Sequence, residues 1–125
     1  MVTKGFKDML AEANSEVDAM SIEDAMGLVG NDEVVFVDVR ETQENQAGAI
    51  PGSVHVPRGL LEFIADPEAP IHKPELASGK KLILYCATGG RSALSAQTLR
   101  RMGLDNVVNL TGGITAWKQA GGAVD

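Results

Sequence analysis

A single cysteine, followed closely by two glycines, an arginine and a serine, is the part of this 125-residue sequence best suited to covalent chemistry. The stretch lies between an apolar run at 82–85 and a segment at 93–99 that suits a helix, and it reads Cys86, Ala87, Thr88, Gly89, Gly90, Arg91, Ser92. This order predicts a strand, a tight turn and a helix. In such a turn the backbone N–H groups face one centre at the positive end of the helix dipole, where an anion is stabilised.

The first position of this turn should change the chemistry of the thiol. Because the N–H groups favour the charged form, we expect Cys86 to be acidic, nucleophilic and reachable from solvent. Gly89 and Gly90 would let the loop close tightly, and Arg91 would offer a planar cation to an oxyanion. Ser92 could cap the helix or donate a hydrogen bond toward the sulfur. The pattern also allows a plainer interpretation, inert core packing of Cys86, because free cysteines are often buried.

A second candidate group follows another buried run. Residues 34–37 are all β-branched or aromatic, which is typical of a parallel strand buried on both faces. Asp38 then stands at the carboxyl end of a central strand, the edge where open α/β sheets bind ligands. Its carboxylate could pair with Arg40 or Arg91, or could cap the following turn. Arg40, Arg58 and Arg91 could supply positive charge to a substrate, although Arg58 could equally be solvated surface.

The spacing of Cys86, Gly89, Arg91 and Ser92 after a buried strand resembles the active-site loop of rhodanese-domain sulfurtransferases. Three further segments resemble elements of that family and occur in the family's order: Asp38–Glu41, Ala49–Ser53 and Leu110–Trp117. Ala49 departs from the family pattern, which usually has a histidine at this position. We expect this departure to affect local packing more than chemistry, because sulfur transfer does not require a histidine base.

The resemblance implies a fold and a division of the chain. The fold is α/β with three layers, a mainly parallel central sheet of about five strands with helices on both faces. The alternation of strand-like and helix-like segments along the sequence agrees with this expectation. The implied parts are an N-terminal helical extension at 1–16 and a rhodanese-like domain at 17–125.

The resemblance also implies a chemistry. Cys86 would be the catalytic nucleophile that takes a sulfane sulfur from thiosulfate or another persulfide donor, either a small molecule or a protein. The sulfur would stay on Cys86 as a persulfide until a thiol or cyanide removes it. Because the chain has no second cysteine, this acceptor must come from outside. Substrate would be bound by Ala87, Thr88, Gly89, Gly90, Arg91 and Ser92, with Asp38, Arg40 and Arg58 in support. No cofactor is implied.

Two other classes of protein stay open. Protein tyrosine phosphatases and the rhodanese-like cell-cycle phosphatases use a Cys-x5-Arg loop, and an arsenate reductase would also need this longer loop. Cys86 and Arg91 are spaced as Cys-x4-Arg, one residue shorter. A non-catalytic rhodanese module that binds partner proteins is the second alternative, although such modules frequently lack the cysteine. Within the leading interpretation, Ala87 and Thr88 stand where thiosulfate-using relatives often carry a basic residue. Thiosulfate could therefore be a poor donor.

Composition narrows the partners and the location. The chain has 17 acidic and 11 basic residues and a net charge of −6, so nucleic acid and anionic membranes are poor partners. No apolar stretch has the length of a signal peptide or a membrane span, and a reactive thiol fits a reducing compartment, so we expect a cytoplasmic protein. His55 and His72 show no spacing with Cys86 that would suit a metal ion.

The first segment of the chain lies outside the resemblance. Phe6, Met9, Leu10 and Ala13 share one face of a helix predicted over 3–14. We expect this face to dock on the domain. Self-association is the less favoured use, so the expected state is a monomer or a weak homodimer.

The remaining segments predict the elements that position the loop. They comprise an edge strand at 16–20, a helix at about 22–29, strands at 54–56 and 106–110, and a helix from the loop to about Met102. Three prolines between 66 and 79 predict an irregular loop, either a lid or a plain connection. Trp117 is expected to anchor the core.

Overall fold

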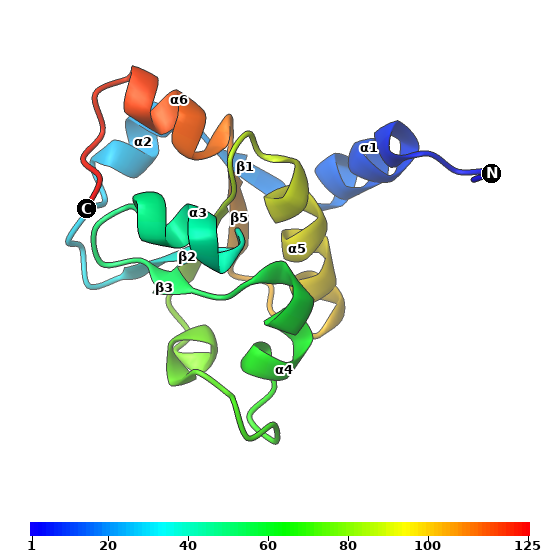
Figure 1. Cartoon of the computed structure of the whole chain (residues 1–125). Helices are drawn as coiled ribbons and strands as arrows, with labels where there is room; N and C mark the ends of the chain where they lie inside the picture. The colour runs from blue at the N-terminus through cyan, green and yellow to red at the C-terminus, as the bar shows by residue number, and fades with distance from the viewer.

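A five-stranded parallel sheet with the strand order β1-β5-β4-β2-β3 forms the centre of the fold. The structure is a computed structural model that describes the whole chain, Met1–Asp125 (Figure 1). The strands are β1 (Asp18–Met20), β2 (Val34–Asp38), β3 (Val54–His55), β4 (Lys81–Tyr85) and β5 (Val107–Leu110). The helices are α1 (Phe6–Glu16), α2 (Ile22–Met26), α3 (Thr42–Ala47), α4 (Leu61–Ala65), α5 (Gly90–Arg101) and α6 (Gly113–Gln119), with 3-10 helices η1 (Arg58–Leu60) and η2 (Pro74–Ala77).

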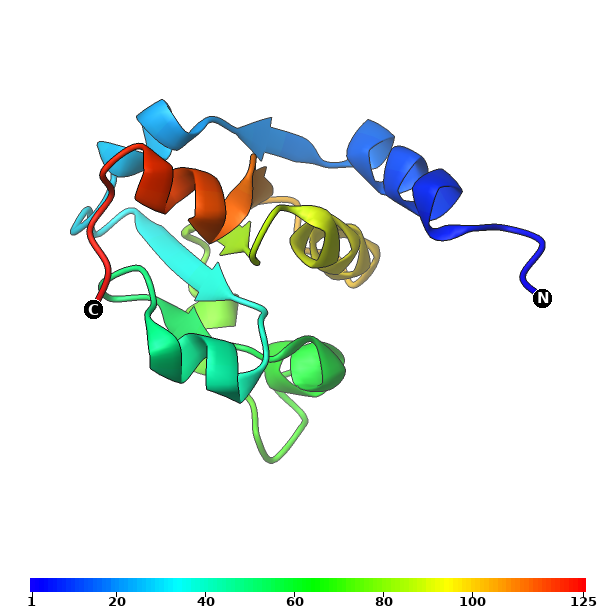
Figure 2. The same ribbon diagram turned by 45° about the horizontal axis from the view of Figure 1, so that its top comes forward.

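Side chains of the central strand β4 alternate between two hydrophobic clusters. Leu82 and Leu84 belong to one cluster, together with residues of α4 and α5. Ile83 and Tyr85 belong to the other, with residues of α2 and α6, because successive side chains of a strand point to opposite faces. In Figures 1 and 2, α2 and α6 lie together, away from α4 and α5. The prediction of an α/β fold with helices on both faces is therefore confirmed.

Trp117 anchors the second cluster. Its indole is 1% exposed and meets the ring of Phe36 edge to face, with the ring centres 5.8 Å apart. The indole N–H donates to the carbonyl oxygen of Ala123 over 2.9 Å, so the one polar atom of the side chain is satisfied. The expected core role of this residue is confirmed.

Parallel pairing brings the carboxyl ends of the strands to one edge of the sheet. Asp38 of β2 lies in register with Tyr85 of β4, and Leu84 of β4 lies in register with Asn109 of β5. Cys86 follows Tyr85 directly. Asp38, Cys86 and Asn109 therefore come to the same edge, from three neighbouring strands.

The N-terminal helix packs less closely than predicted. α1 begins at Phe6 rather than at residue 3 and contacts α5. Ala13 is fully buried, and Leu10 is half-buried beside Gly90. Phe6 and Met9 remain 69% and 46% exposed, so only half of the predicted apolar face docks on the domain. Figure 2 shows α1 extending outward from the sheet toward the N-terminus.

Two other local predictions need correction. The helix expected over 22–29 ends at Met26, where Gly27 follows, because glycine favours helix interiors least among residues other than proline. The stretch 66–79 is not wholly irregular, since η2 begins with Pro74, a residue tolerated in the first turn of a helix. None of the helices is both long enough and apolar enough to cross a lipid bilayer.

Candidate functional site

The sulfur of Cys86 accepts hydrogen bonds from the turn between β4 and α5. The Gly89 nitrogen lies 3.1 Å from Sγ, and the Ser92 hydroxyl oxygen lies 3.3 Å from it. Burial acts to raise the pKa of the Cys86 thiol. Hydrogen bonds from the Ser92 hydroxyl and from the backbone N–H groups of Ser92, Gly89 and Thr88 outweigh burial, so the pKa lies below its usual value. The predicted strand, turn and helix are present, and their amides face the sulfur.

The accessibility predicted for this sulfur is wrong in the present conformation. Cys86 is only 1% exposed, and its side chain belongs to the hydrophobic cluster that contains Leu84, Ala96 and Leu99. The turn closes so tightly that the groups that donate to the sulfur also help to cover it. A molecule in solvent can therefore reach the sulfur only after covering residues move.

The other loop residues differ in how tightly they are held. Gly89 has a left-handed backbone with φ +107°, whereas Gly90 is ordinary helix, and a Cβ there would meet only Leu10 at normal contact distance. Glycine is thus required at the first of these positions and not at the second. Thr88 is exposed, and the carbonyl oxygen of Ala87 accepts a hydrogen bond from the N–H of Thr115 in α6 over 3.0 Å.

Ser92 contacts the sulfur and does not cap the helix. Gly89 is the N-cap residue of α5 and makes no side-chain capping bond. The Ser92 hydroxyl is fully buried and lies 2.6 Å from the side-chain oxygen of Asn109. The amide nitrogen of Asn109 lies 3.1 Å from the carbonyl oxygen of Gly89. Asn109 was not among the predicted site residues, although a polar residue inside a buried strand is a signal that hydrogen-bond partners surround it.

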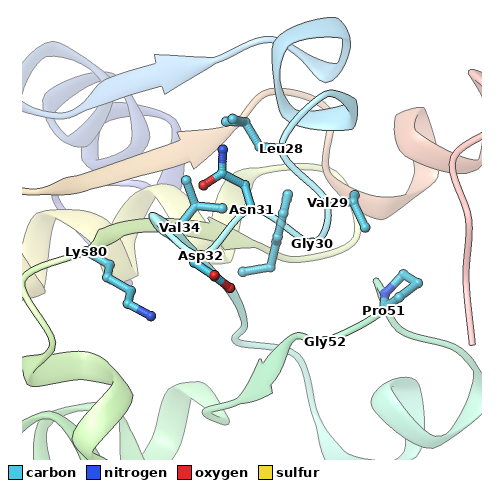
Figure 3. Close-up of a pocket in the computed structure, with 10 residues that line it drawn as sticks. Leu28, Val29, Gly30, Asn31, Asp32, Val34, Pro51, Gly52 and Lys80 are labelled. Carbon is cyan, nitrogen blue, oxygen red and sulfur yellow. The ribbon is translucent and has the colours of Figure 1, made fainter.

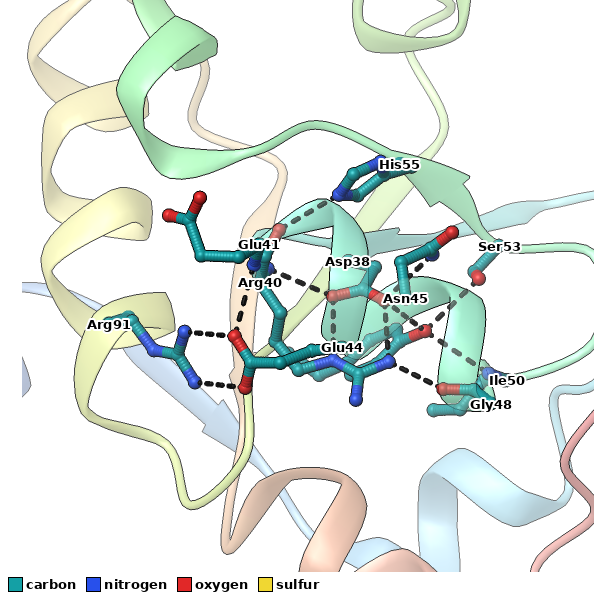
Figure 4. A network of polar contacts seen from close by, with 11 residues as sticks. Asp38, Arg40, Glu41, Glu44, Asn45, Gly48, Ile50, Ser53, His55 and Arg91 are labelled. Atoms are coloured by element: carbon teal, nitrogen blue, oxygen red, sulfur yellow. Dashed lines mark hydrogen bonds and ion pairs between the residues drawn. The ribbon is translucent and has the colours of Figure 1, made fainter.

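Arg91 is already occupied by a carboxylate. Its two terminal nitrogens lie 2.7 and 2.9 Å from the two oxygens of Glu44 on α3 (Figure 4). The hydrogen bond from Arg91 is the main cause that lowers the pKa of Glu44 to about 2, and Glu44 in turn raises the pKa of Arg91. Cys86 acts in the same direction on the pKa of Arg91. The guanidinium predicted to receive an oxyanion is therefore paired with Glu44 in this structure, and the two side chains are 39% and 35% exposed.

Asp38 pairs with Arg40 and not with Arg91. The Asp38 carboxylate is fully buried and accepts hydrogen bonds from the backbone N–H and the Nε of Arg40, both at 2.9 Å, and from its Nη2 at 2.7 Å. Asn45 and the hydroxyl of Tyr85 also donate to it. Burial acts to raise the pKa of Asp38, but the bonds from Arg40 and Asn45 lower it below the ordinary value of 3.8. Both predicted roles, pairing with Arg40 and capping the turn, are present.

The buried pair of Asp38 and Arg40 also fixes the position of α3, the helix whose Glu44 pairs with Arg91. Asn45 connects Asp38 to α3, and the Nη2 of Arg40 donates to the carbonyl oxygen of Gly48 just after that helix. Glu44, between these anchors, also accepts a hydrogen bond from the N–H of Glu41 (Figure 4). Asp38 and Arg40 thus form no hydrogen bond with the cysteine loop themselves, and act on it by positioning α3, whose Glu44 binds Arg91.

Arg58 does not join the other predicted residues. Its guanidinium donates to Glu62 over 3.0 Å and to the hydroxyl of Thr98 over 3.4 Å. None of its hydrogen bonds reaches residues 86–92. The structure therefore gives no support to a role for Arg58 in holding a substrate.

Two hollows of about 350 Å³ lie at opposite edges of the sheet. The hollow drawn in Figure 3 is lined by Val34 and Lys80, where β2 and β4 begin, and it contains none of the predicted site residues. The other flanks the cysteine loop between α1 and β5, with Leu10, Thr88 and Asn109 in its walls. The cysteine loop thus borders an open hollow, although Cys86 itself does not line it.

The fold and the loop together define a class of protein, a three-layer α/β domain with a cysteine in an amide-lined turn after a central strand. Residues 21–120 match the family model of the rhodanese-like domain, so this chain belongs to that family. A protein named sulfurtransferase from Allochromatium vinosum is 31% identical over 107 residues, which cover 86% of this chain and 91% of the relative. The thiosulfate:glutathione sulfurtransferase of Saccharomyces cerevisiae is 36% identical, with 86% of this chain and 83% of that protein covered.

A solved structure from Rhodopseudomonas palustris matches the chain including α1. It is 44% identical with a TM-score of 0.94, covers 100% of this chain and 97% of its own, and is described as a protein of unknown function and possible tyrosine phosphatase. Several other curated relatives are longer, and this chain spans only 46% to 59% of their length.

Proposed function

We propose that this chain is a sulfurtransferase that carries a sulfane sulfur on Cys86. The observation that carries the proposal is the position of the Cys86 sulfur, within hydrogen-bond distance of the Gly89 N–H and the Ser92 hydroxyl, at the N-terminus of α5. Such donors stabilise a thiolate and, after sulfur transfer, an anionic persulfide. The relatives named as sulfurtransferases support the same activity.

The reaction would proceed in two displacements. The Cys86 thiolate attacks the outer sulfur of the donor, the sulfur–sulfur bond of the donor breaks, and the leaving group departs with the electron pair, as sulfite when the donor is thiosulfate. The persulfide on Cys86 is then attacked at its outer sulfur by an external thiolate or by cyanide, which restores the Cys86 thiolate. Residues 87–92 would surround the transferred sulfur.

Donor preference follows from the charges around the loop. Ala87 and Thr88 carry no charge, and the cation of Arg91 is shared with Glu44. A dianion such as thiosulfate must compete with Glu44 for that cation. We therefore propose that a low-molecular-weight or protein persulfide is the better donor. Asp38 and Arg40 would support the site by holding α3.

The proposal also covers the cellular location of the protein and the division of the chain. Persulfide chemistry on a lone cysteine suits a reducing compartment, so we propose the cytoplasm as the location. We also treat residues 1–16 as an extension of the domain at 17–125, since α1 ends at Glu16 and the family match begins at 21.

Weighing the intact protein after exposure to a donor tests the proposal. Incubation with thiosulfate or glutathione persulfide should add the mass of one sulfur atom, and cyanide should remove it as thiocyanate. The Cys86→Ser variant should gain no sulfur from either donor. If neither donor adds sulfur to the wild-type protein, a non-catalytic binding module becomes the better description.

A phosphatase is the second candidate, because the 44% identical structure is described as a possible tyrosine phosphatase. The distance along the chain from Cys86 to Arg91 argues against it, since a loop one residue shorter than Cys-x5-Arg leaves less room for a phosphate. Hydrolysis of an aryl phosphate by the pure protein, lost in Cys86→Ser, would favour the phosphatase. We expect no hydrolysis above that of the variant.

Replacing Glu44 with glutamine should make the loop more attractive to anions. The change removes the negative partner of Arg91 while keeping the shape of the side chain. The rate at which Cys86 is alkylated by anionic iodoacetate, relative to neutral iodoacetamide, should rise about two- to fivefold. Glu62→Gln, which removes the partner of Arg58, is the matched control and should leave the ratio unchanged. An unchanged ratio in Glu44→Gln would mean that Arg91 does not act on the approach to the sulfur.

A further inference from the structure

We propose that Asn109 is a positioning residue that controls which acceptor receives the hydroxyl proton of Ser92, and thereby tunes the readiness of Cys86 to react. Its consequence for turnover rests on the proposed sulfur transfer, whereas the proton arrangement itself follows from the contacts of the unloaded protein. Asn109 is 6% exposed on β5, and its amide contacts Gly89 in the loop between β4 and α5 and Ser92 in the first turn of α5.

The orientation of the Asn109 amide is fixed by the carbonyl of Gly89. That carbonyl oxygen can only accept a hydrogen bond, so the amide atom 3.1 Å from it must be the nitrogen. The amide oxygen of Asn109 therefore faces the hydroxyl of Ser92, at 2.6 Å. An amide oxygen has no proton, so Ser92 must be the donor in this contact.

The Ser92 hydroxyl has one proton and two acceptors within reach. The Ser92 oxygen lies 2.6 Å from the Asn109 oxygen and 3.3 Å from the larger sulfur atom, so either acceptor is within hydrogen-bond distance. While Ser92 donates to Asn109, it presents only lone pairs to the sulfur, an arrangement that suits a neutral thiol donating its own S–H to Ser92. When the sulfur is ionised, the hydroxyl must turn toward it and give up Asn109. Asn109 therefore competes with the sulfur and favours the thiol.

The charged groups near the sulfur do not take part in the competition between Asn109 and the sulfur for the Ser92 proton. Arg91 on α5 and, through it, Glu44 on α3 are the charges that approach the loop. Asp38 and Arg40, at the end of β2, are bonded to each other. None of these groups contacts Asn109 through a hydrogen bond, so a change at Asn109 should act through Ser92 and Gly89 alone.

The proposal is tested by measuring the pKa of the Cys86 thiol in the Asn109→Leu variant, in which leucine has a similar shape to asparagine but no hydrogen-bonding atoms. Thiolate absorbance in the ultraviolet is followed against pH, with Cys86→Ser as the blank, so that no reagent has to reach the buried sulfur. Freed from Asn109, the Ser92 hydroxyl can donate to the thiolate without loss, and the pKa of Cys86 should fall by about one unit. A purely structural role for Asn109 predicts the opposite sign, because a loosened loop stabilises the thiolate less.

The double variant gives the second readout. In the presence of Ser92→Ala, the change Asn109→Leu should no longer lower the pKa, since the proton in question is absent. Asn106→Leu is the matched control just before the same strand, because the Asn106 amide donates to the carbonyl oxygen of Lys80 and its loss should leave the thiol unaffected. A rise in the pKa of Asn109→Leu, or an equal fall with and without Ser92, overturns the proposal. Neither readout uses a sulfur donor, so the result stands whether or not Cys86 forms a persulfide.

Discussion

Replacing Gly113 with alanine is expected to lower the free energy of unfolding by about 2–5 kcal/mol, by combining left-handed strain with overpacking. Gly113 has φ +61°, and a Cβ there would lie 2.5 Å from the carbonyl oxygen of Ala87 and 2.6 Å from that of Cys86. Both neighbours are backbone atoms, which cannot move aside as a flexible side chain can. Urea unfolding of the wild-type protein and the variant measures the loss.

The same change should disturb the cysteine loop. The N–H of Ile114 donates to the carbonyl oxygen of Cys86 over 2.9 Å, next to the position where the new methyl group would stand. The control is Gly121→Ala, because Gly121 has φ +85° but nothing within 4 Å of its Cβ position. The Gly121→Ala variant should lose only the free energy that a left-handed backbone costs alanine, about 1–2 kcal/mol. Equal losses in the two variants would show that the contact with the loop costs nothing.

Asp38→Asn is expected to lower the free energy of unfolding by about 3–5 kcal/mol, because it leaves a buried guanidinium without its counter-charge. The Asp38 carboxylate only accepts hydrogen bonds, whereas an amide would bring its own N–H atoms toward a ring of donors. Arg40 is 5% exposed and cannot turn to water without opening the end of β2. Urea unfolding of the folded variant supplies the measurement, and Asp105→Asn, at an exposed position, is the control.

The pH dependence of this difference has a definite sign. The pKa of Asp38 is lower in the folded protein than its ordinary value of 3.8, so the folded state binds this proton less readily than the unfolded state. Its contribution is therefore complete above that ordinary value and is lost as the pH falls through the folded value. The gap between wild type and Asp38→Asn should be constant near neutral pH and shrink in acid. A gap that grows in acid would contradict the assignment.

The sheet was predictable because its signal is local. The runs at 34–37 and 82–85 are apolar throughout, and only a strand covered on both faces accommodates such runs at that length. The turn after Cys86 was predictable for the same reason, since its glycines and the helix that follows are adjacent in the chain. The end of α2 was missed because the apolar residues beyond Gly27 extend the helical period without forming helix.

The partners that tune the site could not be predicted in this way. Glu44 meets Arg91 across 47 positions of the chain, and Asn109 meets Ser92 across 17, so no short motif contains either pair. The burial of Cys86 depends on how the whole loop closes, which residue types alone do not determine. The pairing of Asp38 was partly predictable, because its partner Arg40 is only two positions away in the chain and is one of the two partners that the sequence suggests.

If Cys86 carries a sulfane sulfur as proposed, the enclosure of this side chain would separate storage of the sulfur from its delivery. A sulfur atom held at this exposure would meet dissolved reductants only when the residues that cover it move. Its lifetime is then governed by the frequency of opening rather than by the concentration of whatever lies outside. The protein would then set when the sulfur is released, and a partner that displaces the covering residues would trigger the release.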